Sequence, residues 1–337
     1  MNTYSIILPV HNGGEYIKEC VKSILSQTYE NFNLHILENC STDGTAEWLN
    51  TITDKRVIII PSDKFLSIEE NWDRIKTIEK NEYMTMIGHD DILYPNYLET
   101  MEGLISKHPQ ASLYQTHFNL IDAAGIFLSN CKKMPSKLTF FKFLELMLQN
   151  NIDVTGTGFL MREKDYIEIG GIPLFPYLLC ADNTLFLKLT KLSYLVIDES
   201  STFSFRRHKS TSIIYLVTKH ILGLEYFVHY LVNEKNKYNK TKEIISQNGR
   251  KYIVNNCHAI THKLIHTHPF DRKGVYVKNI VDKCNELCTL LIGKRSKNVL
   301  RDFRISLAYI IDYSATGRYI FYFFRKKIYS KPILHGK

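Results

Sequence analysis

Three features that define large classes of proteins are missing from this chain of 337 residues. No apolar run approaches the roughly 20 residues that span a bilayer, so the sequence predicts no transmembrane helix. The first turn, HNGGE at residues 11–15, lacks the G-x-G-x-x-G fingerprint, which excludes a dehydrogenase of the usual dinucleotide-binding kind. No G-x-x-x-x-G-K-[ST] segment is present, which excludes a P-loop nucleotide site.

The start of the chain shows no pattern typical of a leader sequence. The N-terminus has neither a basic segment nor a long apolar stretch, so we expect no signal peptide. The predicted location is the cytoplasm, with peripheral attachment to the inner face of the cell membrane as a further expectation. In that reducing compartment the seven scattered cysteines are expected to remain free thiols.

Acidic residues are scarce in the last third of the chain. Residues 1–218 hold 20 Lys and Arg against 26 Asp and Glu, whereas residues 219–337 hold 23 against 8. This difference predicts that the C-terminal part faces something anionic, either phospholipid headgroups or nucleic acid. Because these Lys and Arg follow no recognised reading module, we predict no nucleic-acid partner.

The tail of the chain favours a membrane surface. Leu307, Ile310 and Ile311 share one face of an expected helix, and an aromatic cluster at 319–324 precedes the basic run at 325–327. Aromatic residues beside cations are typical of interfacial helices, so an anionic membrane surface is the expected partner. The alternative is a C-terminal helix that packs its aromatic face on the N-terminal domain.

Short apolar runs alternate with amphipathic stretches through the first hundred residues. The runs at 4–8, 33–37, 57–60 and 83–87 are typical of buried strands, and helical spacing at 17–25 and 68–78 indicates helices between them. Such short connections imply parallel pairing and right-handed crossovers. We predict the α/β class: a doubly wound, mostly parallel sheet with flanking helices over residues 1–218. Residues 219–337 are expected to form a basic, mainly helical region.

Two adjacent aspartates, Asp90 and Asp91, follow the expected strand at 83–87. Open α/β sheets bind their ligands at this carboxyl edge. Neighbouring side chains of an extended backbone point in opposite directions, so one carboxylate is expected on a divalent metal and the other on a hydroxyl. Such a pair suits a nucleoside diphosphate, whose leaving charge a metal neutralises. The alternative is a solvated Asp-Asp turn.

Seven sequence elements follow one another along the chain: Pro9, Asn12 and Glu15; Ser26 to Thr28; Ser41 to Thr45; Asp90 and Asp91 with Pro95; residues 157–173; Asp182; and Arg206 with His208. In this order they resemble those of the inverting glycosyltransferases of family 2, which have the GT-A fold. The resemblance runs from about Ser5 to Ser212, and residues 1–218 are accordingly identified as a catalytic domain.

The resemblance implies a division of roles among these residues. Asp182, at the start of an amphipathic helix, is the expected general base, and its alternative is a helix N-cap. Asp91 and His208 are the expected ligands of a divalent metal, Mg²⁺ or Mn²⁺. The nucleotide-sugar site is expected to comprise Pro9, Asn12, Glu15, Asn39, Asp90 and Arg206. Arg206 would bind phosphate, unless residues 206–209 form a solvated basic loop.

Two positions depart from the family pattern. The chain has Glu38-Asn39 where the family usually carries two aspartates, and the amide of Asn39 still offers a donor and an acceptor to a pyrimidine edge. Ala181 stands where the family often has Glu, which leaves Asp182 as the predicted base.

The resemblance implies inverting transfer of a sugar from a nucleoside-diphosphate sugar, with a UDP-sugar as the expected donor. The acceptor would be a hydroxyl of a glycan or a lipid-linked glycan, in the synthesis of a bacterial cell-surface polysaccharide. The alternative function is a catalytically weak GT-A-like scaffold of a glycan synthesis complex.

Overall fold

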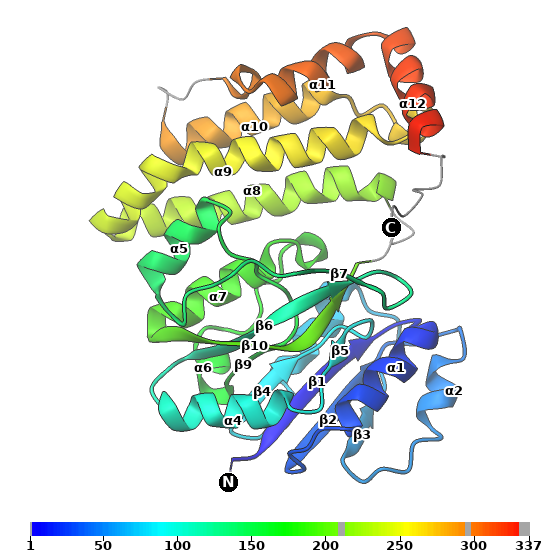
Figure 1. Ribbon diagram of the computed structural model, residues 1–337, viewed down its shortest axis with the longest axis vertical. Coiled ribbons are helices and arrows are strands. Elements are labelled where there is room, and N and C mark those ends of the chain that lie inside the picture. Colours follow the sequence, from blue (N-terminus) through cyan, green and yellow to red (C-terminus); the bar gives the residue numbers. More distant parts are fainter. Residues whose placement is uncertain (1, 208–212, 294–297, 330–337) are drawn as a thin grey trace, which may run out of the picture. The chain divides into compact units, whose positions relative to one another are not determined.

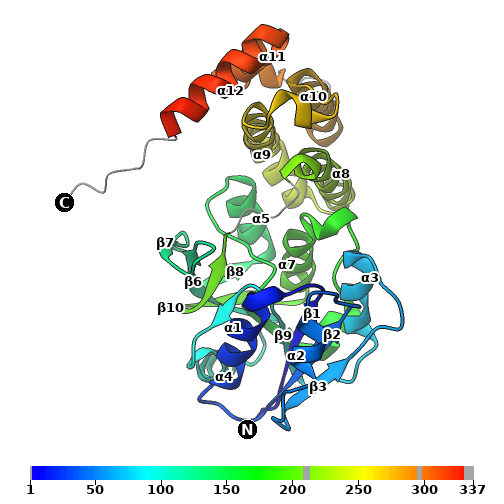
Figure 2. The same ribbon diagram turned by 90° about the vertical axis from the view of Figure 1, so that its right-hand side faces the viewer.

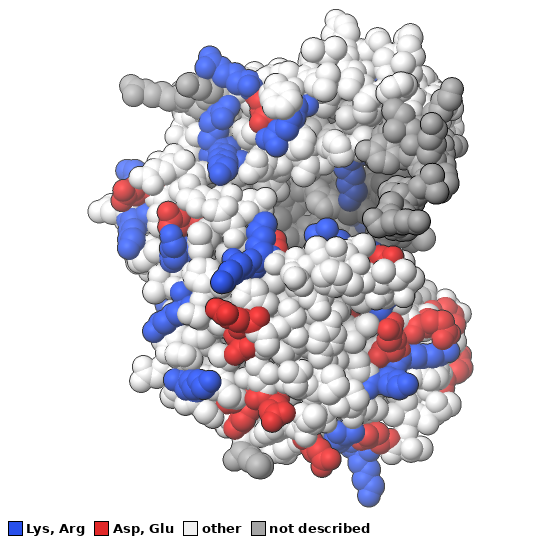
Figure 3. All heavy atoms as spheres, in the orientation of Figure 1, with Lys and Arg blue, Asp and Glu red and all other residues white. Residues whose placement is uncertain are grey.

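The structure is a computed structural model that describes residues 2–207, 213–293 and 298–329, without side chains at 213–216 and 325–329. The chain divides into two compact units, Met1–His208 and Lys209–Lys337 (Figure 1). The boundary predicted between residues 218 and 219 falls inside the first helix of the second unit. On the face shown in Figure 3, Asp and Glu gather mainly over the first unit, whereas Lys and Arg predominate over the second.

The first unit begins with four parallel strands in the spatial order β3-β2-β1-β4. All seven residues of β1 are buried, as expected for a strand covered on both faces. Helix α1 turns Ile17, Val21 and Ile24 toward this sheet at helical spacing. The elements are β1 (Tyr4–Val10), α1 (Gly14–Leu25), β2 (Phe32–Glu38), α2 (Thr45–Leu49), β3 (Val57–Ile60), α3 (Ile68–Asp73), the 3₁₀ helix η1 (Arg74–Lys76) and β4 (Tyr83–Met86).

The remaining strands continue the same sheet in the order β4-β9-β6-β10-β5. Strand β9 is antiparallel to both β4 and β6, so β6 and its parallel neighbour β10 run in the direction of β1 to β4. The elements are β5 (Ile92–Leu93), α4 (Tyr97–Lys107), β6 (Leu113–Ile121), β7 (Phe127–Asn130), β8 (Lys137–Thr139), α5 (Phe140–Leu148), β9 (Phe159–Arg162), α6 (Glu163–Glu168), η2 (Pro176–Leu178), α7 (Ala181–Leu192) and β10 (Tyr194–Arg206).

This topology creates one functional edge. The carboxyl ends of β1, β2, β3, β4 and β10 meet there, together with the beginning of the antiparallel strand β9. We call it the carboxyl edge. Ligands of open α/β sheets bind at such an edge.

The second unit is helical and is seen from the side in Figure 2. Helix α9 packs against α8, α10 and α11, and α12 follows α11. No helix in the described part of the chain is long and apolar enough to cross a membrane. The elements are α8 (Ile213–Lys237), α9 (Asn239–Ile265), η3 (Pro269–Arg272), α10 (Val277–Ile292), η4 (Val299–Arg301), α11 (Phe303–Tyr313) and α12 (Ala315–Tyr329).

Candidate active site

The loops after β1 and β2 are tied together at the carboxyl edge. Asn12 has a left-handed backbone (φ 53°), and its Oδ1 accepts a hydrogen bond of 2.7 Å from the backbone N–H of Thr42. In return, the N–H of Asn12 donates to Ser41 Oγ at 2.9 Å, and the N–H of Gly14 donates to Asp43 Oδ2 at 2.9 Å. Through these hydrogen bonds, the segment at 41–45 fixes the conformation of the loop after β1.

Asn39 holds a second loop in place. Its side chain is buried, its Nδ2 donates to the carbonyl of Leu66, and its Oδ1 accepts from the N–H of Leu66, both at 2.9 Å. The amide thus satisfies the backbone of the loop after β3, as two strand-like hydrogen bonds would. The predicted pairing of Asn39 with a pyrimidine stays a prediction, because it would compete with these bonds.

The loop that Asn39 holds carries an aromatic side chain at the same edge. Phe65 is 63% exposed, and its ring centroid lies 4.8 Å from that of His11. His11 Nδ1 in turn lies 2.8 Å from the carbonyl oxygen of Asn39. The two ring planes are tilted by 59° to each other, so each ring separately offers an aromatic face near the ends of β1 and β2. Neither residue was predicted as part of the site, because neither belongs to a recognised motif.

Pro9 and Glu15 differ in their surroundings. Pro9 is buried inside β1, where its backbone pairs in register with Leu37. The side chain of Glu15 is 85% exposed and forms an ion pair of 2.6 Å with Lys18 on the surface of α1. Pro9 therefore shapes the strand that leads into the site, and Glu15 lies at its rim.

Asp90 and Asp91 lie in a turn, so the extended backbone predicted for them is wrong. The N–H of Asp91 donates to the carbonyl of Gly88 at 3.2 Å and closes this turn. As a result both carboxylates converge on Gly88: a Cβ added there would lie 2.9 Å from Asp90 Oδ1 and 3.2 Å from Asp91 Oδ2. Only glycine leaves room for this convergence.

Asp91 is buried and held by two donors. The N–H of Arg206 donates to its Oδ1 at 2.8 Å. The hydroxyl of Thr157, which lies just before β9, forms a hydrogen bond with the same carboxylate. Burial, and after it the charge of Asp90, raises the pKa of Asp91 well above its usual range. Thr157 lies at the start of the segment at 157–173 that carries the family resemblance, but no role was predicted for it.

Arg206 is buried and links the aspartate turn to α1. Its Nε donates to the carbonyl of Asp90 at 2.7 Å, its Nη2 pairs with Glu19 Oε2 at 2.5 Å, and its guanidinium lies 4.8 Å from the ring centre of Tyr16. Its Nη1 faces the carbonyls of Asp122 and Ala123. The side chain is 2% exposed, so the predicted phosphate contact stays a prediction that this geometry does not support.

Asp182 lies in the first turn of α7. The N-cap of the helix is Cys180, so the alternative role of Asp182 as an N-cap is wrong. Its Oδ1 accepts a hydrogen bond of 2.8 Å from the N–H of Asn183. Burial raises the pKa of Asp182 from its ordinary value of 3.8 to about 6, and the neighbouring N–H groups oppose this shift only in part.

The backbone before Asp182 is strained. Tyr177, Leu178 and Cys180 all have positive φ angles, between 54° and 64°, which L-residues rarely adopt. The N–H of Tyr177 donates to Glu69 Oε1 on α3 at 2.5 Å, which fixes the segment. Backbone strain of this kind costs about 1–3 kcal/mol per residue, and it persists only where surrounding contacts hold the strained conformation in place.

Topology brings Asp182 to the edge that holds Asp90 and Asp91. Helix α7 has 12 residues and enters β10 directly, at the end of the sheet where that strand begins. A helix of this length spans about 18 Å, so its first turn lies toward the carboxyl edge. The bond from Tyr177 to α3, which follows β3 at that edge, agrees with this placement. His208 lies outside the described residues.

The aspartate pair fits a divalent cation by its chemistry. Two carboxylates converge on Gly88, and the pKa of Asp91 is raised first by burial and then by the charge of Asp90. Among residues 2–207, 213–293 and 298–329, no group of three or more His, Cys, Asp or Glu is arranged to hold a metal ion. Mg²⁺ is commonly bound by one or two carboxylates, with substrate phosphates and water as its other ligands.

Comparison with known proteins identifies the N-terminal unit. Residues 5–170 match the model of Glycosyl transferase family 2. The chain carries a glycosyl transferase family 2 domain. Glycosyltransferase GlyG of Streptococcus pneumoniae serotype 4 is 27% identical over 125 residues, which cover 36% of this chain and 42% of GlyG. An uncharacterized glycosyltransferase of Rickettsia felis is 29% identical over 211 residues, 60% of this chain and 34% of that protein. The chain thus spans less than half the length of these relatives.

The fold extends beyond the family 2 match. TarS 1-349 of S. aureus, solved in complex with UDP-GlcNAc, superposes with a TM-score of 0.61 at 13% identity, over 96% of this chain and 92% of TarS 1-349. A longer TarS structure superposes with a TM-score of 0.57 at 11% identity, over 85% of this chain and 54% of that chain. The predicted fold class is confirmed: a GT-A-like, mixed and mostly parallel sheet with flanking helices and a helical C-terminal region.

Proposed function

We propose that this protein transfers a sugar from a UDP-sugar to an acceptor hydroxyl with inversion at the anomeric carbon. The single observation that carries this proposal is the meeting of two kinds of carboxylate at one edge of a family 2 domain. A converging pair, Asp90 and Asp91, suits a cation and a diphosphate, and Asp182 has a pKa of about 6. The proposed acceptor is a glycan or lipid-linked glycan of a bacterial cell surface.

Asp182 is the proposed general base. In the reaction, the acceptor oxygen forms a bond to the anomeric carbon, and the bond from that carbon to the diphosphate oxygen breaks. The proton of the acceptor hydroxyl passes to the carboxylate of Asp182, and the electron pair of the broken bond leaves with the diphosphate. A base works best when its pKa lies near the working pH, and a pKa of about 6 meets this requirement.

Asp91, with Asp90 beside it, is the proposed holder of Mg²⁺ or Mn²⁺. Such a cation, when bound, would neutralise charge on the departing diphosphate. The protein supports the site through Thr157 and the N–H of Arg206, which fix the carboxylate of Asp91. His208 is the second proposed ligand of this cation.

The proposed UDP site lies between the loops after β1 and β2. The crystal structure of TarS 1-349 in complex with UDP-GlcNAc supports a UDP-sugar as donor. Phe65 and His11 offer the rings on which a base would stack, and Asn39 holds the loop that carries Phe65. Asn12, at the end of β1, would shape the passage to the diphosphate.

A screen of UDP-sugars tests the proposal. The full chain is incubated with each donor and Mg²⁺ or Mn²⁺, and release of UDP is measured with and without chelator. We expect release that depends on the metal and is lost in Asp91→Asn, while Asp282→Asn, an exposed carboxylate on α10, behaves as the wild type. Undiminished activity in chelator would rule out the metal role.

The same screen separates the scaffold alternative from the enzyme. A scaffold that kept the fold would bind UDP with the metal, as judged by calorimetry, yet release no UDP from any donor. Turnover without dependence on Asp182 would contradict the assigned base and leave the reaction class intact.

A further inference from the structure

Helix α11 presents a continuous apolar stripe to solvent. Phe303, Leu307 and Ile310 recur at helical spacing and are 77%, 55% and 69% exposed. The opposite face of the helix is buried at Ile305, Ala308 and Asp312. Since the buried side is already fixed by packing within the helical unit, the stripe is a surface that this packing leaves uncovered.

The next helix carries a second exposed apolar group. Ile320, Phe323 and Phe324 of α12 are all more than half exposed. Their neighbour Phe321 stacks on His266 with ring centroids 5.7 Å apart, which sets the orientation of α12 against α9. We call these three residues, together with Phe303, Leu307 and Ile310, the apolar face of α11 and α12. Large exposed apolar groups of this kind mark interaction sites.

The charges around this apolar face favour an anionic partner. Residues 298–329 contain six Lys and Arg and only two acidic residues, Asp302 and Asp312. Both acids are neutralised inside the unit, Asp302 by Arg304 at 2.7 Å and Asp312 by an ion pair with Arg272. By sequence, the segment thus carries four more basic than acidic residues.

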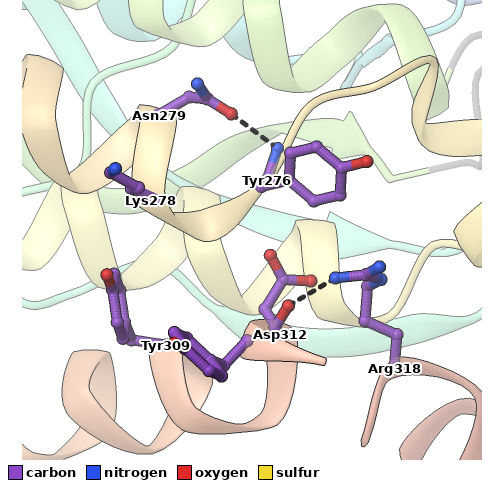
Figure 4. A pocket seen from close by; sticks show the side chains of 7 residues that line it. Tyr276, Lys278, Asn279, Tyr309, Asp312 and Arg318 are labelled. Carbon is purple, nitrogen blue, oxygen red and sulfur yellow. Dashed lines mark hydrogen bonds between the residues drawn. The ribbon is translucent and has the colours of Figure 1, made fainter. Parts of the chain in front are cut away.

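A cationic pocket opens beside the stripe, between the start of α10 and the end of α11 (Figure 4). Its volume is about 400 Å³, and its walls include Tyr309 and Tyr313 of α11 and Lys278 of α10. Arg318 enters from α12, donates to the backbone carbonyl of Asp312 at 2.6 Å and lies 4.9 Å from the ring centre of Tyr276. The pocket thus combines two cations with phenol hydroxyls.

The carboxylate of Asp312 does not offset these cations. One of its oxygens pairs with Arg272, and the other accepts a hydrogen bond of 2.7 Å from the N–H of Val277. The dashed contacts of Figure 4 show the Arg318 bond to the backbone of Asp312 and the bond that closes the turn before α10. An anion, and in particular a phosphate group, fits this chemistry.

We propose that the apolar face of α11 and α12 inserts into the interfacial layer of an anionic phospholipid membrane, with a lipid phosphate in the pocket lined by Lys278 and Arg318. An amphipathic helix with aromatic residues and flanking cations binds such surfaces by apolar burial and by attraction to anionic lipids together. This proposal does not rest on glycosyl transfer, and its test needs no sugar nucleotide.

Co-sedimentation of the full chain with vesicles tests the proposal. We expect binding to phosphatidylglycerol vesicles, little binding to pure phosphatidylcholine, and release by high salt. Ile310→Glu combined with Phe323→Glu should weaken binding on the order of 100-fold, because two apolar side chains no longer leave water. Lys278→Gln should weaken it about five-fold, the effect of one charge near the surface.

Matched controls lie on other helices of the same unit. Leu290→Glu changes an exposed leucine at the far end of α10, and Lys242→Gln removes an exposed lysine of α9. Both should bind vesicles as the wild type does. Circular dichroism checks that each variant is folded; should the double variant unfold, Ile310→Ser alone replaces it in the same assay.

Three outcomes would overturn the proposal. The first is absence of binding to anionic vesicles at low salt, and the second is unchanged binding by folded apolar-face variants. The third is a dimer in light scattering that dissociates in Ile310→Glu, which would make this face a contact between copies. Tight binding of soluble glycerol phosphate without vesicle binding would assign the pocket to a soluble phosphate instead.

Discussion

At the scale of single residues, Asp182 carries the sharpest expectation. Asp182→Asn should cut turnover by roughly 10²-fold or more, the scale of a lost general base, while the affinity for UDP and metal stays nearly unchanged. Steady-state kinetics and calorimetry measure the two quantities, with Asp282→Asn as control. An equal loss of turnover and of affinity would point to a structural role instead.

The same substitution should also stabilise the protein at alkaline pH. Because the folded state holds the proton of Asp182 more tightly than the unfolded chain does, the contribution of this group to stability falls as the pH rises from about 4 to about 6. In Asp182→Asn the stability no longer falls over this pH range, so the substitution should raise the free energy of unfolding at pH 8 by roughly 1–3 kcal/mol. Denaturant unfolding at pH 4 and pH 8 measures the difference, and a destabilised variant would contradict it.

The dependence of turnover on pH should report the same carboxylate. A base must be deprotonated to act, so kcat should rise with pH and level off above an apparent pKa near 6. The acidic limb is measured at saturating donor with metal present. A limb near pH 4 would mean that the carboxyl is solvated in the complex and would weaken the case for Asp182.

The sequence predicts which residues lie at the carboxyl edge better than it predicts the contacts that each of them makes there. Asp90 and Asp91 were expected to point apart, but the turn closed on Gly88 brings their carboxylates together. Asn39 was expected to face a base, yet its amide holds Leu66. Local spacing does not encode these partners, because each depends on a loop 27 or more residues away or on a turn that no periodic pattern signals.

At the scale of elements, Arg206 joins parts of the chain that are far apart in sequence. It links β10 to α1 through Glu19, to the aspartate turn through the carbonyl of Asp90, and to the turn before β7 through Ala123. The half-exposed Glu19 was not foreseen in this role, because a glutamate on a surface helix gives no signal of a buried partner.

Arg206→Met therefore should act first on stability. We expect a loss of roughly 2–4 kcal/mol in unfolding free energy, since the carbonyls and Glu19 lose a buried charged donor. Donor affinity should fall in parallel, as the aspartate turn loosens. Denaturant unfolding and calorimetry decide the case: a full loss of affinity with unchanged stability would restore the predicted phosphate contact. Lys18→Met, on the exposed side of α1, is the control.

The parallel half of the sheet could be predicted, whereas its continuation could not. Short connections between apolar runs fix parallel neighbours from β1 to β4, because only a crossover helix fits between them. Strand β9 instead pairs Leu160 with Thr85 across 75 positions of sequence, and nothing local marks that partner. The predicted helix at 68–78 ends at Asp73 and continues as a 3₁₀ turn, which frees Arg74 to bond the carbonyls of Glu38 and Pro61.

At the scale of the whole molecule, binding of a nucleotide should appear as global stabilisation. Hydrogen bonds join the loops after β1 and β2, and Arg206 of β10 holds the loop after β4, so a ligand that bridges these loops favours the folded state. A ligand at 100 times its dissociation constant adds about 2.7 kcal/mol. We expect UDP with Mg²⁺ or Mn²⁺ to raise the unfolding midpoint, and UDP with chelator to raise it much less.

The preference for one nucleobase of the donor is tested by the same measurement of the unfolding midpoint. Stacking on Phe65 and His11 would accept any base, so preference for UDP over CDP and GDP must come from polar groups, and Asn39 is the nearest predicted one. Asn39→Asp keeps the acceptor toward the N–H of Leu66 but loses the donor toward its carbonyl. If Asn39 only holds the loop, this variant lowers the midpoint without ligand and affects UDP, CDP and GDP alike. If it also reads the base, the preference among the three nucleotides changes, and a protein stabilised by GDP but not by UDP would overturn the proposed donor.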